Sequence, residues 1–199
     1  LSGKSSAERG LMGKDLSASV TRQAVADPMG LIRDLVKQPT VKKVLPIFVV
    51  LLVVAAFGLA SMCETAWSRF ISDSELDRVN QADGARVDIS PLTVALIQEM
   101  SDGFELTGGD FNPTLLPRVV EVGYLASLVH EGRVTQVPEG ARVFDSLDDI
   151  DLDERSVQLP VGMTLDSGGI GKGFAADLIA AAVSAAINNI SNAFRQQGG

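Results

Sequence analysis

The sequence predicts an α+β domain preceded by one transmembrane helix. Three observations support this prediction: an uncharged apolar run at residues 44–63, short strand-like alternations separated by helix-period segments, and a glycine-rich turn that leads into an alanine-rich helix. The chain has 199 residues, so it has room for one ordinary domain and an appendage but not for two such domains.

The charge distribution predicts the orientation of the membrane helix. The net charge is −8, yet residues 1–43 carry eight of the 17 Lys and Arg residues and only four of the 25 acidic residues. The run at 44–63 matches the roughly 30 Å hydrocarbon thickness at about 1.5 Å rise per residue. Lys42 and Lys43 flank it, so we expect a single-pass protein of the cell membrane with a cytoplasmic N-terminus and an extracytoplasmic C-terminal domain.

Two alternatives to a membrane span fit this run less well. A buried core helix rarely lacks a polar side over such a length. A signal peptide has a shorter basic region and a shorter apolar core. A transmembrane helix at residues 44–63 is therefore the preferred interpretation.

The N-terminal 43 residues are expected to form a basic cytoplasmic tail with one short amphipathic helix. Asp27 and Pro28 are a typical helix start, and Pro39 ends the apolar periodicity. This helix either lies on lipid headgroups or docks a partner. The domain then occupies residues 64–199. This outer domain is acidic and the tail lacks interleaved aromatic residues, so nucleic-acid binding is not expected.

After the membrane helix, the pattern alternates between short strands and helices. Ser90 and Pro91 begin a helix that ends at Gly108 and Gly109. The other expected elements are a helix-turn at 68–80, strands at 86–89, 157–160 and 163–165, a helix at 115–129 and an acidic loop at 131–153. The acids of this loop are of the type that binds calcium, but no EF-hand frame is present, so a solvated loop is the simpler interpretation.

The segment from Leu165 to Asp177 has the composition of a phosphate-binding turn. Its glycines allow the backbone to approach an anion closely, the following helix offers free N–H groups, and Lys172 adds a positive charge. The spacing fits neither a Walker A motif nor a dinucleotide fingerprint. A phosphorylated ligand is expected; the alternative is a glycine turn that only joins a strand to a helix. The expected buried side of that helix comprises Phe174, Leu178, Ala181, Ala182, Ala185 and Ile187.

Three ordered blocks resemble the ApbE family of FAD:protein FMN transferases: residues 67–80, 106–114 and 165–177. The resemblance covers about residues 64–185 and is strongest to the actinobacterial branch. It implies an incomplete ApbE-like domain that transfers FMN from FAD to a threonine or serine of an acceptor protein, in a Mg²⁺-dependent reaction. FAD and Mg²⁺ are then the cofactors, the acceptor protein and the membrane are the partners, and homo-oligomer formation is left open.

The resemblance also assigns the residues of the site. It implies a metal ligand at the backbone carbonyl of Gly171 and places Lys172 by the pyrophosphate. The acceptor hydroxyl is the nucleophile, so no catalytic side chain of this chain is assigned. The residues implied to bind FAD are Ser68, Asn80, Phe111, Asn112, Thr114, Asp166, Gly168, Gly169 and Lys172.

The chain departs from the family pattern at several positions. Asn112 stands where the family usually has Asp, and Ser167 replaces an apolar residue. A membrane helix occupies the place of the family's first strand and helix, and the family's second half, with its side-chain metal ligands, would follow the closing helix. Weak Mg²⁺ affinity is therefore expected, and the activity of the truncated transferase is left open. The alternatives are a non-catalytic single-pass membrane or assembly protein and a chimeric fragment without activity.

Three single residues have competing interpretations. Trp67 is either a flavin-stacking side chain or an anchor at the membrane interface. Cys63 is interpreted as an apolar residue at the membrane edge, since Met62 is too large for the small residue expected before a lipidated cysteine. His130 is the only histidine and is expected to be a loop residue.

Overall fold

The computed structural model describes residues 39–127 and 131–197, which divide into two compact units. One unit, Phe57–Ala181, is here called the core unit. The described part of the other unit comprises residues 39–56 and 182–197. His130 and the amphipathic helix predicted after Asp27 lie outside the described residues.

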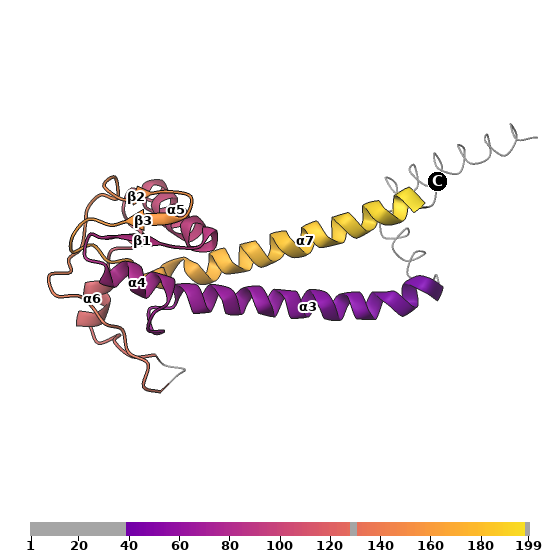
Figure 1. Ribbon diagram of the computed structural model, residues 1–199, viewed down its shortest axis with the longest axis horizontal. Helices are drawn as coiled ribbons and strands as arrows, with labels where there is room; N and C mark the ends of the chain where they lie inside the picture. Colours follow the sequence, from indigo (N-terminus) through magenta and orange to yellow (C-terminus); the bar gives the residue numbers. More distant parts are fainter. Residues whose placement is uncertain (1–38, 128–130, 198–199) are drawn as a thin grey trace, which may run out of the picture. The chain divides into compact units, whose positions relative to one another are not determined.

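The elements form an α+β fold, as predicted, and Figure 1 labels them along the chain. Both α3 and α7 continue from the core unit into the other unit. The elements are α3 (Pro39–Trp67), α4 (Glu75–Gln81), β1 (Arg86–Asp88), α5 (Pro91–Leu106), α6 (Leu116–Glu121), β2 (Asp151–Leu152), β3 (Ser156–Gln158), the 3₁₀ turn η1 (Ser167–Gly169) and α7 (Gly171–Gln197).

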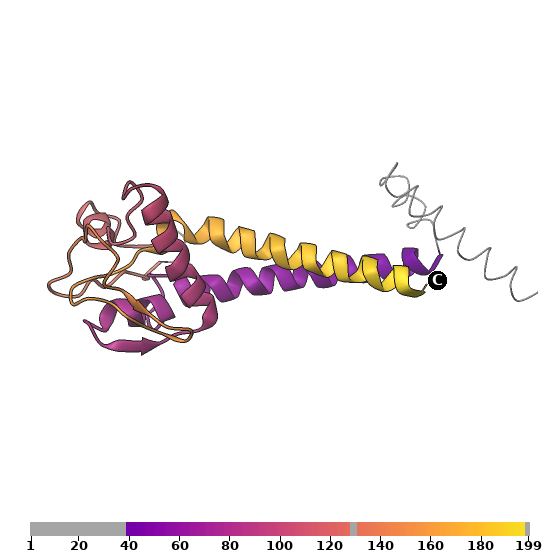
Figure 2. The same ribbon diagram turned by 90° about the horizontal axis from the view of Figure 1, so that it is seen from above.

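The sheet of the core unit has three antiparallel strands in the order β1-β3-β2. In the middle strand, Val157 lies opposite Val87 of β1 and Leu152 of β2. Val157 is fully buried and joins Leu96 and Met100 of α5 in one hydrophobic core. Figures 1 and 2 show α5 beside this small sheet. The sheet therefore depends on the helix for burial, because three short strands have little apolar area of their own.

The helix α5 begins and ends where the sequence predicts. The hydroxyl of Ser90 accepts a hydrogen bond from the Thr93 backbone N–H at 3.4 Å, and Pro91 lies in the first turn. At the other end Gly109, with φ of 90°, donates its N–H to the Phe104 carbonyl at 2.9 Å. This left-handed backbone favours glycine and stops the helix.

Glu75 joins the start of α4 to the start of α5. Its carboxylate accepts hydrogen bonds from the Ser90 backbone N–H at 3.0 Å, from the Ser90 hydroxyl at 2.8 Å and from the Thr93 hydroxyl. Partial burial raises the pKa of Glu75, but these hydrogen bonds and the charge of Arg78 outweigh it, so the pKa lies below its ordinary value. The ionised carboxylate therefore stabilises this junction.

Two predicted elements are wrong in length or type. The helix expected at 115–129 is reduced to α6, which ends before Gly123, a residue with φ of 98°. The strand expected at 163–165 is not formed. Both backbone polar groups of Leu165 bond to the side chain of Asn80 instead of to a neighbouring strand.

Among the residues that the structure describes, two helices are long and apolar enough to cross a membrane: Lys42–Trp67 within α3 and Gly171–Ala193 within α7. The helix expected at 44–63 is confirmed as a helix, and the second candidate was not anticipated. Both rest on length and composition alone, which is weak evidence for a membrane span.

The buried side predicted for α7 is wrong beyond its first turns. Phe174 and Leu178 pack against the core. The four remaining residues of the predicted stripe are exposed: Ala181, Ala182, Ala185 and Ile187. Helical periodicity identified an apolar face, but it carried no information on how far that face is covered.

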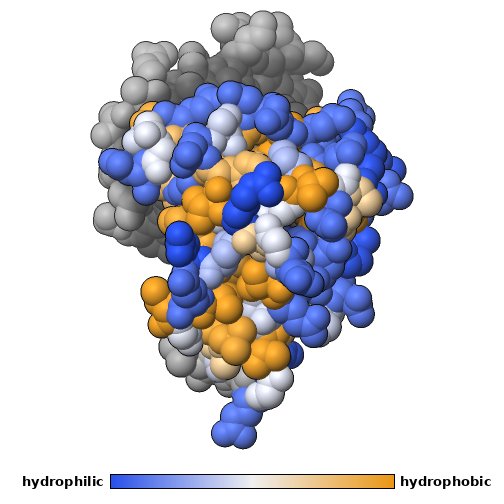
Figure 3. Space-filling model, turned by 90° about the vertical axis from the view of Figure 1, so that its left-hand side faces the viewer, coloured by the Kyte–Doolittle hydropathy of each residue, from blue (hydrophilic) through white to orange (hydrophobic). Residues whose placement is uncertain are grey.

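The exterior of the core unit is mixed in character. Figure 3 shows hydrophobic groups in separate clusters within a mostly hydrophilic face. Exposed apolar side chains of this unit include Leu106 and Val122. Arg86 of β1 pairs with Asp151 and, at 2.9 Å, with Asp153, so an arginine engages two acids of the predicted solvated segment.

Candidate functional site

The glycine-rich segment forms a 3₁₀ turn that opens α7. The carboxylate of Asp166 caps this turn by accepting a hydrogen bond from the Gly168 N–H at 3.0 Å. The carbonyl of Ile170 accepts from the Phe174 N–H at 3.0 Å as α7 begins. Gly168, Gly169 and Lys172 are exposed. The turn and the helix start therefore bring the first N–H groups of α7 and a lysine onto one short segment, here called the cradle, residues 166–172.

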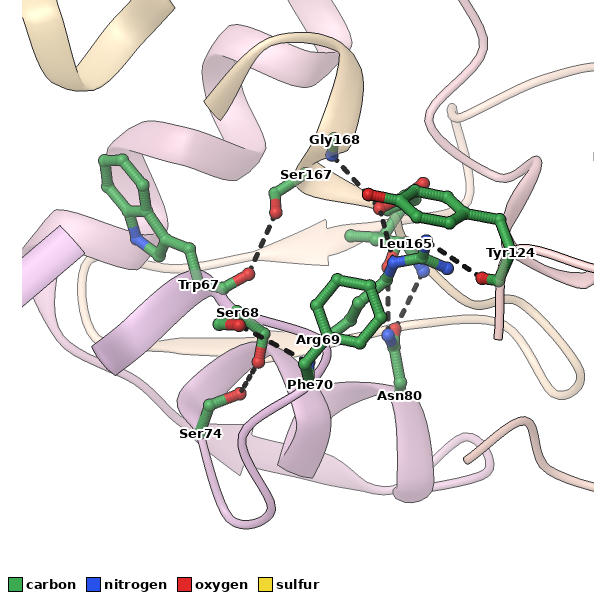
Figure 4. Close-up of polar contacts among 11 residues, drawn as sticks. Trp67, Ser68, Arg69, Phe70, Ser74, Asn80, Tyr124, Leu165, Ser167 and Gly168 are labelled. Atoms are coloured by element: carbon green, nitrogen blue, oxygen red, sulfur yellow. Dashed lines mark hydrogen bonds and ion pairs between the residues drawn. The ribbon is translucent and has the colours of Figure 1, made fainter. Parts of the chain in front are cut away.

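Residues of the first block hold the segment that enters the cradle. Asn80 is only 3% exposed. Its amide nitrogen donates to the Leu165 carbonyl at 2.9 Å, and its amide oxygen accepts from the Leu165 N–H at 2.7 Å (Figure 4). The Ser167 hydroxyl donates to the Trp67 carbonyl at 2.9 Å. Two separate points of the first block thus fix the position of the turn.

Arg69 of the same block lies buried beside the cradle. Its side chain is 4% exposed, and its Nε is 3.6 Å from Asp166 Oδ1. Nη2 donates to the Tyr124 carbonyl at 3.2 Å, and the guanidinium carbon is 4.6 Å and 4.7 Å from the ring centroids of Phe70 and Tyr124. Nη1 is buried and has no hydrogen-bond partner among the described residues. Figure 4 shows the guanidinium close to both aromatic rings.

The second block holds the cradle from a different part of the chain. The Pro113 carbonyl accepts from the Asp166 N–H at 2.8 Å. The ring of Phe111 lies so close to Gly169 that an added Cβ there would be 2.9 Å from Phe111 Cε2. A larger residue at this position would therefore require the Phe111 ring to shift.

Asn112 and Thr114 support the second block from within. The Asn112 amide nitrogen donates to the Phe144 carbonyl at 2.9 Å. The Thr114 hydroxyl donates to Asn112 Oδ1 at 2.7 Å and accepts from the Phe144 N–H at 2.9 Å. These polar groups are used inside the protein, where they fasten the loop that carries Phe111.

The residues assigned to FAD binding thus differ in what they offer a ligand. Gly168, Gly169 and Lys172 face solvent, whereas Asn80 and Thr114 are buried and hydrogen-bonded internally. The remaining assigned residues are partly buried: Ser68, Phe111, Asn112 and Asp166. The Ser68 hydroxyl accepts from the Phe70 N–H at 3.4 Å, which supports the turn before α4.

Arg69 and Tyr124 were missed as site residues, and Trp67 was misread. Arg69 contacts Tyr124 across 55 positions of sequence, and no local pattern signals such a pair. Trp67 is 3% exposed and stacks on Phe174 with ring centroids 5.9 Å apart. Its ring is part of the core, so both interpretations that needed an accessible ring, flavin stacking and membrane anchoring, are wrong. Cys63 lies in the same core.

The donor set for a metal ion is small. Within residues 39–127 and 131–197, no three His, Cys, Asp or Glu side chains lie close enough together to hold one. Gly171 is buried at the first position of α7 and offers a single backbone oxygen. Mg²⁺ prefers an octahedral set of about six oxygens. The described residues therefore do not fit a resident Mg²⁺ site on their own.

Comparison with known proteins connects this geometry to one family. The ApbE family model matches residues 34–199. A search of curated protein sequences found no match. The fold is similar to that of the Pseudomonas stutzeri flavinyl transferase ApbE in its apo form, at 22% identity and a TM-score of 0.55, covering 68% of this chain and 44% of that one. It is also similar to the ApbE protein of Thermotoga maritima MSB8, at 20% identity and a TM-score of 0.52, covering 64% of this chain and 42% of that one.

The chain spans less than half the length of both of these solved relatives. At this level of identity the two structures establish a shared fold. The match to the family model extends over most of the chain and includes all three blocks that meet at the cradle. The chain therefore belongs to the ApbE family.

Proposed function

We propose that this chain is a membrane-associated flavin transferase, in which the cradle binds the pyrophosphate of FAD and FMN passes to a threonine or serine of an acceptor protein. The hydroxyl oxygen of the acceptor would attack the phosphorus of the FMN half, the bond to the bridging pyrophosphate oxygen would break, and AMP would leave as the hydroxyl proton is released. Family membership and the name of the Pseudomonas stutzeri relative support a reaction of this class.

One observation carries the proposal: the first and second blocks, both far from the cradle in sequence, converge on it. Leu165 is held by Asn80 across 85 positions, and Ser167 by Trp67 across 100. Asp166 is held by the Pro113 carbonyl. A turn that merely joins a strand to a helix needs no such convergence. A turn that must keep several N–H groups aimed at an anion does, because preorganised donors bind without a further ordering cost.

The exposed groups of the cradle match the chemistry of a pyrophosphate. The N–H groups at the start of α7 carry the positive end of the helix dipole, and Lys172 adds a full charge. Lys172 is exposed and no ion pair of its side chain is found within the described part of the chain. It is therefore available to a phosphate, and its charge would stabilise the negative charge of the transferring group.

Mg²⁺ remains part of the proposal only as a weakly bound ion. The carbonyl of Gly171 alone cannot supply the octahedral coordination of Mg²⁺, so the described residues are expected to bind the ion with low affinity. FAD binding and transfer are therefore both measured with Mg²⁺ and, in parallel, with a chelator.

The first test is a titration of the full chain in detergent with FAD. We expect saturable binding, seen as quenching of Trp67, the only tryptophan of the chain, and as a change in flavin fluorescence. Lys172→Gln should weaken FAD binding about tenfold, the worth of one hydrogen bond to a charged group. Lys43→Gln is the matched control and should leave affinity unchanged. A folded protein that binds no FAD would refute the proposal.

The second test separates transfer from binding alone. The chain is incubated with FAD, Mg²⁺ and a threonine-containing acceptor peptide, and covalent flavin on the peptide and released AMP are measured. Products in equal amounts support the transferase. Tight FAD binding without either product would instead favour the alternative of a membrane protein that holds flavin without turnover.

A further inference from the structure

A carboxylate lies inside the segment that is proposed to bind phosphate. Asp166 caps the turn through the Gly168 N–H, and its side chain is 15% exposed. An ionised carboxylate accepts hydrogen bonds and cannot donate one to a phosphate oxygen. Left alone, its negative charge would repel the ligand that Lys172 and the helix start attract. The cradle therefore needs a group that cancels this charge without competing for the ligand.

Arg69 satisfies that need from the buried side. Its Nε faces Asp166 Oδ1 at 3.6 Å, whereas its guanidinium is held between Phe70 and Tyr124 and bonded to the Tyr124 carbonyl. Because the side chain is almost fully buried, the charge interaction is poorly screened by solvent. A buried arginine with an unpaired Nη1 is costly to keep, so its place beside Asp166 calls for an explanation beyond packing.

We propose that Arg69 is a positioning residue for phosphate binding. It holds Asp166 in its capping position and cancels the charge of that carboxylate, so that the cradle presents a positive field to a phosphate-bearing ligand. This inference rests on the proposed function and names the residue pair that sets the charge of its binding site.

Charge compensation predicts opposite changes in ligand affinity for single variants of Arg69 and Asp166. Arg69→Gln leaves an uncompensated carboxylate within the segment that is proposed to bind phosphate, which should weaken binding about 10- to 100-fold at the effective dielectric of a protein surface. Asp166→Asn keeps a side chain that caps the turn equally well but removes the charge, so binding of a phosphate ligand should tighten. A residue pair that served only packing would weaken binding in both variants.

The decisive experiment is a double-variant cycle on the full chain in detergent. Wild type, R69Q, D166N and R69Q/D166N are titrated with FAD, with inorganic pyrophosphate and with riboflavin, which lacks phosphate, and Trp67 fluorescence is followed. We expect R69Q to lose FAD and pyrophosphate affinity, the double variant to regain most of it, and riboflavin affinity to change little. Arg69→Lys should retain most of the affinity because it keeps the charge.

Two controls distinguish a loss of binding from a loss of folding. The thermal midpoint of each variant is measured, and Arg118→Gln removes an arginine whose partner, Glu121 at 2.7 Å, is exposed. This variant should match wild type in affinity. If R69Q does not fold, tighter pyrophosphate binding by D166N supports the inference, and weaker binding by D166N overturns it.

The outcomes separate this inference from the proposed function. If wild type binds FAD but the double variant is as weak as R69Q, charge compensation is overturned and the proposed function stands. If wild type fails to bind FAD yet binds pyrophosphate with the expected pattern, the proposed function falls and the role of Arg69 stands. Absence of binding to both ligands overturns both.

Discussion

Asn80 shows how one side chain can take the place of a strand. Its amide pairs with both the N–H and the carbonyl of Leu165, as a neighbouring backbone would. A buried backbone without such partners costs about 1–3 kcal/mol per polar group. The side chain therefore releases Leu165 from the sheet and lets the chain turn into the cradle at the next residue.

At Gly169 the space beside the backbone is taken by Phe111. We expect Gly169→Ala to push the ring aside and weaken FAD affinity about tenfold, a loss of roughly 1.4 kcal/mol. Gly173→Ala is the matched control, since a Cβ at Gly173 meets nothing within 4 Å and alanine favours the helix. Affinity measured by flavin fluorescence should fall only in the first variant. Equal affinities would show that the contact does not shape the site.

At the scale of elements, the junction of α4 and α5 depends on an ionised Glu75. Its pKa is lowered in the folded protein, so its contribution to stability is present above the ordinary pKa of 4.5 and is lost as the pH falls through the lower folded value. Acid should therefore loosen this junction, which lies between the first block and the core helix α5.

The variant Glu75→Gln measures this contribution. We expect it to lower the free energy of unfolding by about 1–2 kcal/mol at pH 7, because a neutral amide accepts weaker hydrogen bonds from Ser90 and Thr93. The difference from wild type should shrink below pH 4.5, where the carboxylate is progressively protonated. Denaturant unfolding followed by Trp67 emission gives both values. Glu105→Gln, on an exposed position of α5, is the control; a pH-independent difference would contradict the assignment.

At the scale of elements, the conformation of Gly123 also explains why α6 is short. Its pattern continues past Glu121, but Gly123 takes a left-handed conformation and the chain turns toward Tyr124, whose carbonyl receives Arg69. A single glycine within an apolar pattern is compatible with both a helix and a turn. Here a distant arginine favours the turn.

At the scale of the whole molecule, two helices of the described part of the chain are candidates for a membrane span. The first turns of α7 belong to the core unit, since Phe174 and Leu178 pack against its core. The same holds for α3, because Cys63 and Trp67 lie in that core, so length alone does not choose between the two helices. We propose α3 as the span, since it is the more apolar of the two and Lys42 and Lys43 flank its apolar run, with the C-terminal domain outside the cytoplasm.

This topology is tested with alkaline phosphatase, which is active only outside the cytoplasm. A fusion after Gly199 should be active if α3 alone spans the membrane. A fusion after Lys43, before the span, is the control and should be inactive. An inactive fusion at Gly199 in a stably produced protein would mean that α7 returns across the membrane.

Local patterns in the sequence determined the positions of several helices and turns of this protein. The apolar run, the caps of α5 and the glycine-rich turn before α7 were predicted from residues close together along the chain, because caps, turns and helical periods depend on neighbours. The family resemblance located the same three blocks and the α+β class. These features need no knowledge of what packs against them.

Only the tertiary structure decided which groups a ligand can reach. It turned Asn80 and Thr114 inward, buried Trp67 against Phe174 and brought Arg69 to Asp166. Each of these outcomes depends on a partner far away in sequence, and a side chain's type alone does not say whether its polar atoms will meet a backbone group, an opposite charge or a ligand. Burial and pairing are properties of the packed chain, so they could not be read from the order of its residues.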